Sequence, residues 1–208
     1  MEQTSISSEA YNRLLDAIFP IILKNGMKAT TMDKVAACLS MSKRTLYEIF
    51  DSKEEMLKQV IGYSHKKHIE NLCRIFKEAD TVMEAFYLTL KTHQSVMGQA
   101  SAAFYQDMDS SYARLRPVYD NQSDTWQRNM LKAIDDGIKQ GVFRSDVNYP
   151  ILLRMFRIQM ESLKRMEEFL PQDVTLNEAF DTISIIFLRS IASQEGAKIL
   201  ERIKNSYS

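Results

Sequence analysis

The chain has 208 residues, of which 45% are hydrophobic, and its 27 basic and 27 acidic side chains give a net charge of zero. That length suits one mid-sized domain or a small domain with a larger one, and the apolar content is sufficient for a core. No apolar run is long enough for a membrane-spanning helix, the beginning MEQTSISSEA is too polar for a signal peptide, and the two cysteines lack metal-ligand spacing, so we expect a cytoplasmic protein without membrane, metal or cofactor.

The first predicted helix runs from about Ser8 to Asn25. Its apolar residues recur at helical spacing and form one stripe; they are Leu14, Leu15, Ile18, Ile21 and Ile22. Gly26 is suited to end this helix, because glycine accepts left-handed backbone angles. Pro20 lies off the stripe, so its ring should face outward.

Residues 26–57 predict two short helices joined by a tight turn, followed by the start of a long helix. Thr30 and Thr31 can cap the first short helix, because a hydroxyl accepts a hydrogen bond from an amide of the first helical turn. The turn is Ser40–Ser42, and Ser42 can cap the second short helix in the same way. This layout is typical of a helix-turn-helix, whose second helix enters the major groove of DNA.

The second short helix, from Lys43 to Phe50, should bury Leu46 and Phe50 and turn its other side outward. The outward side chains suit DNA, since Lys and Arg can meet phosphate or guanine, Thr can touch a thymine methyl, and Tyr can donate to phosphate. A lysine at the start of the following helix lies where amides already favour an anion. The candidate DNA-contacting residues are Thr31, Ser42, Lys43, Arg44, Thr45, Tyr47 and Lys53. Residues 24–53 hold six basic and three acidic side chains, so this neutral chain has a local excess of positive charge.

The remaining sequence predicts helices and no strand, because capping threonines, helix-starting prolines and terminal glycines separate helical apolar patterns. The expected helices span about 53–79, 81–97, 102–115, 117–140, 150–169, 175–193 and 196–204. The predicted fold is therefore all-α, with a three-helix helix-turn-helix domain at 1–52 and a larger helical domain at 53–208 that opens with the long connecting helix 53–79.

The motif resembles that of the tetracycline-repressor (TetR) family of bacterial transcription regulators. The matching residues are Gly26, Ala29-Thr30-Thr31, Val35-Ala36, Ser42-Lys43-Arg44-Thr45-Leu46-Tyr47, Phe50 and Ser52-Lys53-Glu54-Glu55. Ser40 stands where the family usually has glycine. The resemblance implies a homodimer whose larger domain binds a small effector.

Adaptable methionines and flat aromatic side chains are frequent in the larger domain, where they predict either ordinary core packing or an apolar effector pocket. The candidate pocket residues are Met97, Phe104, Tyr105, Met108, Trp126, Met130 and Met155.

The two last long helices are apolar on more than one side, so each must bury more than one side. One side can pack within the subunit and the other against a second copy, giving a four-helix bundle with a twofold axis. The candidate dimer-interface residues are Phe156, Leu163, Ile185 and Leu188.

The sequence thus predicts a ligand-responsive transcriptional repressor that binds a palindromic double-stranded operator as a homodimer and is released by a small apolar effector. A helical interaction protein that has lost DNA binding and docks through its helix-turn-helix is the alternative. No catalytic constellation is visible, so we do not expect an enzyme. His65 and His68 share a helix face, but a metal site would need a third ligand.

Overall fold

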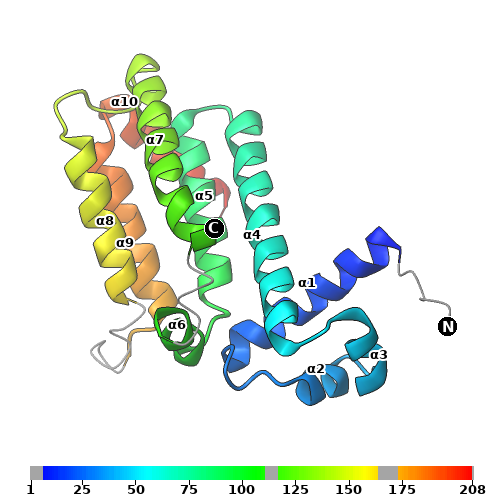
Figure 1. Ribbon diagram of the computed structural model, residues 1–208. Coiled ribbons are helices and arrows are strands. Elements are labelled where there is room, and N and C mark those ends of the chain that lie inside the picture. The colour runs from blue at the N-terminus through cyan, green and yellow to red at the C-terminus, as the bar shows by residue number, and fades with distance from the viewer. Residues whose placement is uncertain (1–6, 111–116, 164–172, 208) are drawn as a thin grey trace. The chain divides into compact units, whose positions relative to one another are not determined.

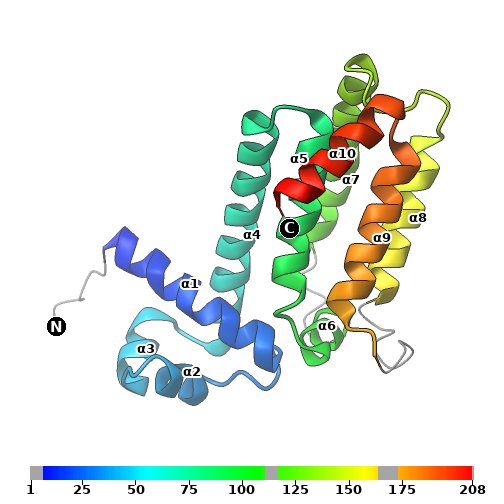
Figure 2. The same cartoon turned by 180° about the vertical axis from the view of Figure 1, so that it is seen from behind.

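The computed structural model describes residues 7–110, 117–163 and 173–207, without the side chains at 97, 109, 117–127 and 161. Within these ranges the fold is all-α and contains ten helices and no strand, which confirms the predicted class (Figure 1, and from behind Figure 2). The helices are α1 (Ser8–Asn25), α2 (Met32–Cys38), α3 (Lys43–Ile49), α4 (Lys53–Glu78), α5 (Val82–Met97), α6 (Ala102–Asp109), α7 (Pro117–Lys139), α8 (Tyr149–Leu163), α9 (Leu176–Ile191) and α10 (Gln194–Ser206). In the described part of the chain, no helix is both long and apolar enough to cross a membrane.

The helices pack into two compact units. The first contains the described residues of 1–70 and 99–118, and the second those of 71–98 and 119–208. The first unit therefore holds α1, α2, α3, the beginning of α4 and also α6. This division differs from the predicted boundary at residue 53, because α6 lies far along the sequence and periodicity carries no information on its packing partner.

The core of the first unit forms from the inward faces of α1 to α4. Fully or almost fully buried members are Ile18, Ile22, Met27, Val35, Leu46, Phe50, Met56, Leu57 and Val60. The rings of Tyr11 and Phe50 lie 5.9 Å apart between their centroids. Pro20 is exposed on α1, as its place off the apolar stripe predicts.

A carboxylate holds α6 against the turn between α1 and α2. Asp107 of α6 is buried, with 8% of its surface exposed, and its Oδ2 accepts the backbone N–H of Lys28 at 2.7 Å. The N–H of Ser101, the residue that caps α6, donates to the carbonyl of Leu23 at 2.9 Å. Gly26 has a φ of 78°, and a Cβ there would lie 2.8 Å from Asp107 Oδ2. Glycine is thus required at this turn both by its conformation and by the approach of α6.

The second unit is built around α5, α7, α8, α9 and α10. Its core includes Met83, Phe86, Met130, Ile134, Phe143, Phe156, Phe187, Leu188, Ile191 and Leu200. Figure 1 shows α8 and α9 side by side, and the rings of Phe156 and Phe187 stack between them at 4.2 Å. An isolated antiparallel bridge joins Phe143 to Ala192 next to the start of α10.

The predicted helix starts are confirmed in most places. Two starts have a threonine followed three residues later by a glutamate, a pair that can form a reciprocal capping box. Thr175 and Glu178 form the complete box at the start of α9. At α5, Thr81 accepts from the Glu84 amide, while the Glu84 carboxylate accepts from the backbone N–H of Asp80. Whether both bonds of a capping box form depends on the side-chain rotamers, which the residue types alone do not determine.

The last helix begins earlier than its glycine suggests. α10 begins at Gln194, capped by Ser193, instead of at Gly196. Gly196 lies inside the helix and does not mark its start. A glycine is needed there because a Cβ would come within 2.0 Å of the Val142 carbonyl oxygen. The ends predicted at 115 and 169 lie outside the described residues.

Candidate nucleic-acid interface

The helix-turn-helix is formed by α2, a tight turn and α3. Thr31 caps α2 by accepting the Lys34 amide at 3.1 Å, and Ser42 caps α3 by accepting the Thr45 amide at 3.0 Å. Ser40 in the turn has a φ of 53°, the left-handed region in which glycine is favoured. This position of the turn therefore has backbone angles typical of glycine, although the residue is a serine.

Thr30 does not cap α2, in contrast to the prediction that offered it beside Thr31. Its side chain is completely buried, and its hydroxyl donates to the Gly26 carbonyl at 2.6 Å. Thr30 thus closes the turn that follows α1.

The outward face of α3 carries the predicted DNA-contacting side chains. Leu46 and Phe50 are buried. The exposed residues of the helix are Lys43, Arg44, Thr45, Tyr47 and Glu48. Tyr47 is 46% exposed, so its hydroxyl can reach an external partner. We call α3 the reading helix.

Both cations of the reading helix contact a carboxylate. Lys43 Nζ lies 2.7 Å from Asp33 Oδ1 and 3.0 Å from Oδ2, and the hydrogen bond to Asp33 raises the pKa of Lys43. Arg44 Nε donates to Glu48 Oε1 at 3.0 Å. Asp33 and Glu48 are not among the predicted site residues, because a carboxylate repels the DNA phosphates and residue type alone does not predict a role for it on such a face.

Four of the predicted DNA-contacting residues make bonds within the chain. The hydroxyls of Thr31 and Ser42 accept the capping bonds given above, and the hydroxyls of Ser42 and Thr45 lie 2.8 Å apart. Lys53 Nζ donates to the Lys28 carbonyl at 2.7 Å, and burial lowers the pKa of Lys53 while the charge of Asp107 opposes that shift. Contact of these residues with DNA stays a prediction.

The predicted pocket residues are distributed over both units. Phe104 and Tyr105 are buried on α6 with ring centroids 5.6 Å apart, and burial raises the pKa of the Tyr105 phenol. Met108 is half-buried on the same helix, whereas Met130 is in the core of the second unit. Met155 is 54% exposed on α8, which corrects its assignment to an interior pocket. The side chains of Met97 and Trp126 lie outside the described set.

The second unit contains an open groove of about 560 Å³. It is lined by Phe76 at the end of α4, by Val82 at the start of α5, and by α7 residues that include Lys132, Ala133 and Lys139. None of these residues was predicted, since their apolar and basic side chains are scattered along the sequence and meet only in the fold.

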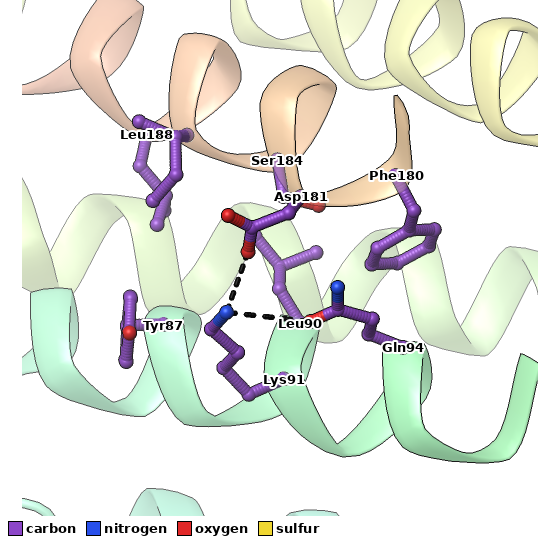
Figure 3. Close-up of a pocket in the computed structure, with 9 residues that line it drawn as sticks. Tyr87, Leu90, Lys91, Gln94, Phe180, Asp181, Ser184 and Leu188 are labelled. Atoms are coloured by element: carbon purple, nitrogen blue, oxygen red, sulfur yellow. Dashed lines mark hydrogen bonds and ion pairs between the residues drawn. The ribbon is translucent and has the colours of Figure 1, made fainter. Parts of the chain in front are cut away.

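A small cavity of about 10 Å³ lies between α5 and α9 (Figure 3). Lys91 bonds there to Asp181 at 2.5 Å and to the Gln94 side chain at 3.3 Å, and its ammonium lies 5.8 Å from the Tyr87 ring centroid. The Ser184 hydroxyl is buried with no hydrogen-bond partner among the described residues. This volume is sufficient for about one water molecule and is too small for an organic effector.

The predicted dimer-interface residues are mostly internal. Phe156, Leu163 and Leu188 are buried within the chain, and Ile185 is half-buried. These three residues therefore pack inside the subunit and not, as the sequence had predicted, against a second copy. The prediction that the two helices are apolar on more than one side is confirmed, because the same helices expose Ile151, Met155, Ile158 and Ile186, each more than half accessible. Periodicity identifies residues that share a face but does not determine which face turns inward.

Burial lowers the pKa of both His65 and His68 on α4, and the charge of His65 adds to the effect on His68. Across the described ranges, no group of three or more His, Cys, Asp or Glu side chains could hold a metal ion.

A helix-turn-helix with exposed basic and hydrogen-bonding side chains on its second helix, in an otherwise all-α chain, defines a DNA-binding regulator. Residues 14–60 match the family described as bacterial regulatory proteins, tetR family. The helix-turn-helix part of this chain is therefore similar to that of the tetR family.

Other comparisons extend over most of the chain. The HTH-type transcriptional repressor KstR2 of Rhodococcus jostii (strain RHA1) is 26% identical over 166 residues, which cover 75% of this chain and 78% of that protein. A transcriptional regulator from Saccharomonospora viridis, solved in complex with choline, has a TM-score of 0.68 at 17% identity, covering 90% of this chain and 100% of that one. The regulator FadR from Bacillus subtilis, solved with stearoyl-CoA, has a TM-score of 0.61 at 17% identity, covering 87% and 99%. At these identities the two structures show a shared fold.

Proposed function

We propose that this chain is a transcriptional repressor that binds a near-palindromic operator as a homodimer and releases it when a small effector binds. The observation that carries the proposal is the surface of the reading helix, where Lys43, Arg44 and Tyr47 are exposed while Leu46 is buried. Such a protein acts on bacterial DNA and hence in the cytoplasm. The family match and the similarity to KstR2 favour this function over a docking module that has lost DNA binding.

DNA binding is tested by selecting bound fragments from a random duplex library at moderate salt and measuring their affinity by gel shift. Arg44→Ala should weaken binding to the selected site by about 1–3 kcal/mol if the guanidinium bonds a guanine edge. Tyr47→Phe should weaken all sequences nearly equally, because a phosphate contact carries no sequence information. Unchanged affinity in a Lys43→Ala, Arg44→Ala double variant would contradict the assignment.

We also propose the groove lined by Phe76, Val82, Lys132 and Ala133 as the effector site. Its volume of about 560 Å³ is within the usual range for small-molecule pockets. Its lining combines apolar side chains with Lys132, Lys139 and the carboxylate of Asp136. Lys139 is paired with Asp135 at 2.5 Å, so Lys132 is the cation we expect to meet an anionic group. An amphiphile with an apolar chain and an anionic group fits this lining, and the FadR structure was solved with an acyl-CoA of that kind.

The groove is tested by titrating a long-chain acyl-CoA, a free fatty acid of the same chain and choline against the operator complex. Ala133→Trp should block release by filling the groove, and Lys132→Ala should weaken only the anionic probes. A confirmed effector that releases both variants as it releases the wild type would place the site elsewhere.

Dimerisation through α8 and α9 completes the proposal. Four large apolar side chains on these two helices, Ile151, Met155, Ile158 and Ile186, are more than half exposed. A second copy would remove them from water in a twofold arrangement, as a four-helix bundle does.

A further inference from the structure

The reading helix has a carboxylate in the middle of its outward face. A helix advances about 100° per residue, so Arg44 and Glu48 lie on the side opposite the buried Leu46 and Phe50. The side chains of Arg44 and Glu48 are 82% and 55% exposed. A carboxylate in this place repels phosphate and lowers affinity for DNA of any sequence. Its presence is therefore better explained by selectivity than by affinity.

The geometry of the pair supports selectivity. Arg44 donates its Nε–H to Glu48 Oε1 at 3.0 Å, across one helical turn. A guanidinium has five N–H donors in a rigid plane, so a bond at Nε favours one orientation and leaves both terminal nitrogens for another acceptor. Two parallel N–H groups match O6 and N7 of guanine in the major groove.

We propose that Arg44 and Glu48 form one recognition unit for a G·C pair, in which Glu48 is a specificity-determining residue. Its carboxylate holds the guanidinium in the orientation that reads guanine. It also disfavours duplexes that offer no guanine there, because they cannot compensate for the repulsion between carboxylate and phosphate. Its second oxygen is an acceptor of the kind to which the cytosine N4 amino group donates. This inference rests on the proposed function, namely DNA binding through the reading helix.

The second ion pair of this face provides a matched comparison. Asp33 bonds Lys43 from α2, at 2.7 and 3.0 Å, and is therefore not on the reading helix. Lysine is a point charge without a planar fork, so Asp33 cannot orient a base contact through it. Loss of Asp33 should change affinity for DNA of every sequence, whereas loss of Glu48 should change which sequence is preferred.

The experiment compares the wild type with Glu48→Ala, Glu48→Gln, Asp33→Ala and Arg44→Lys by selection from randomised half-sites, followed by affinities for the selected and a random duplex. Circular dichroism checks that each variant is folded. Because an exposed ion pair is worth about 0.2–1 kcal/mol, Glu48→Ala and Asp33→Ala should each raise affinity for the random duplex by up to about fivefold. Only Glu48→Ala and Arg44→Lys should reduce the preference for guanine, by about threefold or more, at one common position of each half-site.

The Gln variant separates charge from shape, since it retains an acceptor for Arg44 Nε and should keep part of the guanine preference. A base-preference profile that is unchanged in Glu48→Ala would overturn the inference. Loss of preference at the same position in Asp33→Ala would overturn it too. If instead the wild type selects no sequence, or a Lys43→Ala, Arg44→Ala variant binds normally, the proposed function itself fails.

Discussion

Glycines in helix interiors illustrate at the residue scale how one residue type can serve different purposes. At position 196 in α10, packing requires a glycine, because a Cβ would lie 2.0 Å from the Val142 carbonyl oxygen. In Gly62 of α4 no atom lies within 4 Å of the position of a Cβ. Gly196 is thus needed for the contact between α10 and the turn after α7, and Gly62 is not needed for packing.

Alanine substitutions at these positions should therefore have opposite effects on stability. Gly196→Ala should lower the free energy of unfolding by about 1–3 kcal/mol through overpacking. Gly62→Ala should raise it by about 0.5–1 kcal/mol, because alanine loses less backbone entropy in a helix. Urea denaturation of both variants measures the difference, and equal effects would contradict the packing argument.

Two serines of α9 allow a similar comparison between a hydroxyl without a hydrogen-bond partner and one with a partner. Ser184 has a buried hydroxyl without a hydrogen-bond partner among the described residues, whereas the Ser190 hydroxyl donates to the Phe187 carbonyl at 2.7 Å. Ser184→Ala removes an unsatisfied polar group and should raise stability by up to about 1 kcal/mol. Ser190→Ala is the control and should be neutral or mildly destabilising. A melting temperature that falls more for Ser184→Ala than for Ser190→Ala would indicate a water in the small cavity.

At the scale of elements, the Asp107 carboxylate is one of the groups that attach α6 to the end of α1 and the turn after it. Asp107→Ala would leave the Lys28 amide without its acceptor, which should cost about 1–3 kcal/mol. Hydrogen exchange should show faster exchange at the Lys28 amide than in the wild type. Asp107→Asn retains an acceptor oxygen and serves as the control, so equally fast exchange in both variants would mean that the bond contributes little.

The pH dependence of stability should reflect the two histidines of α4. Their pKa values are lowered in the folded chain, so the unfolded chain binds more protons near and below the usual histidine pKa of about 6.5. Their contribution is complete above that value and declines as the pH falls through the lowered folded pKa. We expect a lower free energy of unfolding at pH 5.5 than at pH 7.5, and a smaller difference in a His65→Gln, His68→Gln variant. Denaturation at both pH values tests this, and an undiminished difference would exclude the histidines as its source.

Much of the element structure was predictable from local signals. The starts of α2, α3, α5 and α9 follow from capping threonines and serines, whose bonds reach only three residues along the chain. The attachment of α6 through Asp107 was not predictable, because that bond joins residues 79 positions apart and an acidic residue on a short helix normally faces solvent.

At the scale of the whole molecule, the exposed side chains of α8 and α9 determine the expected assembly. Ile151→Glu with Ile158→Glu should give monomers, because charges would be buried in an apolar interface. Those monomers should lose operator affinity with Lys43 and Arg44 intact, since two reading helices are needed to bind two half-sites. Light scattering provides the measurement. Ile69→Glu, on an apolar residue of α4 that is 39% exposed, is the control and should remain dimeric.

The DNA-binding face was predictable from the sequence, whereas the groove and the dimer interface were predictable only in part. The reading helix is encoded within eight consecutive residues, from Ser42 to Ile49, and helical geometry alone turns its cations outward. The groove is formed by three helices, and its lining depends on packing that no local pattern contains. For α8, the sequence predicts apolar residues on two sides, but Phe156 is buried within the chain and Ile151 is exposed.

The left-handed backbone at Ser40 has a consequence for how this protein can change over generations. A serine with positive φ costs about 1 kcal/mol relative to glycine, and Ser40 is exposed, so glycine would fit without disturbing a neighbour. Serine codons of the AGT and AGC type become glycine codons by one nucleotide change. A lineage that acquired this change would gain stability in the turn without altering any base-contacting side chain. It could then tolerate a destabilising substitution on the reading helix, and so could acquire a new operator preference.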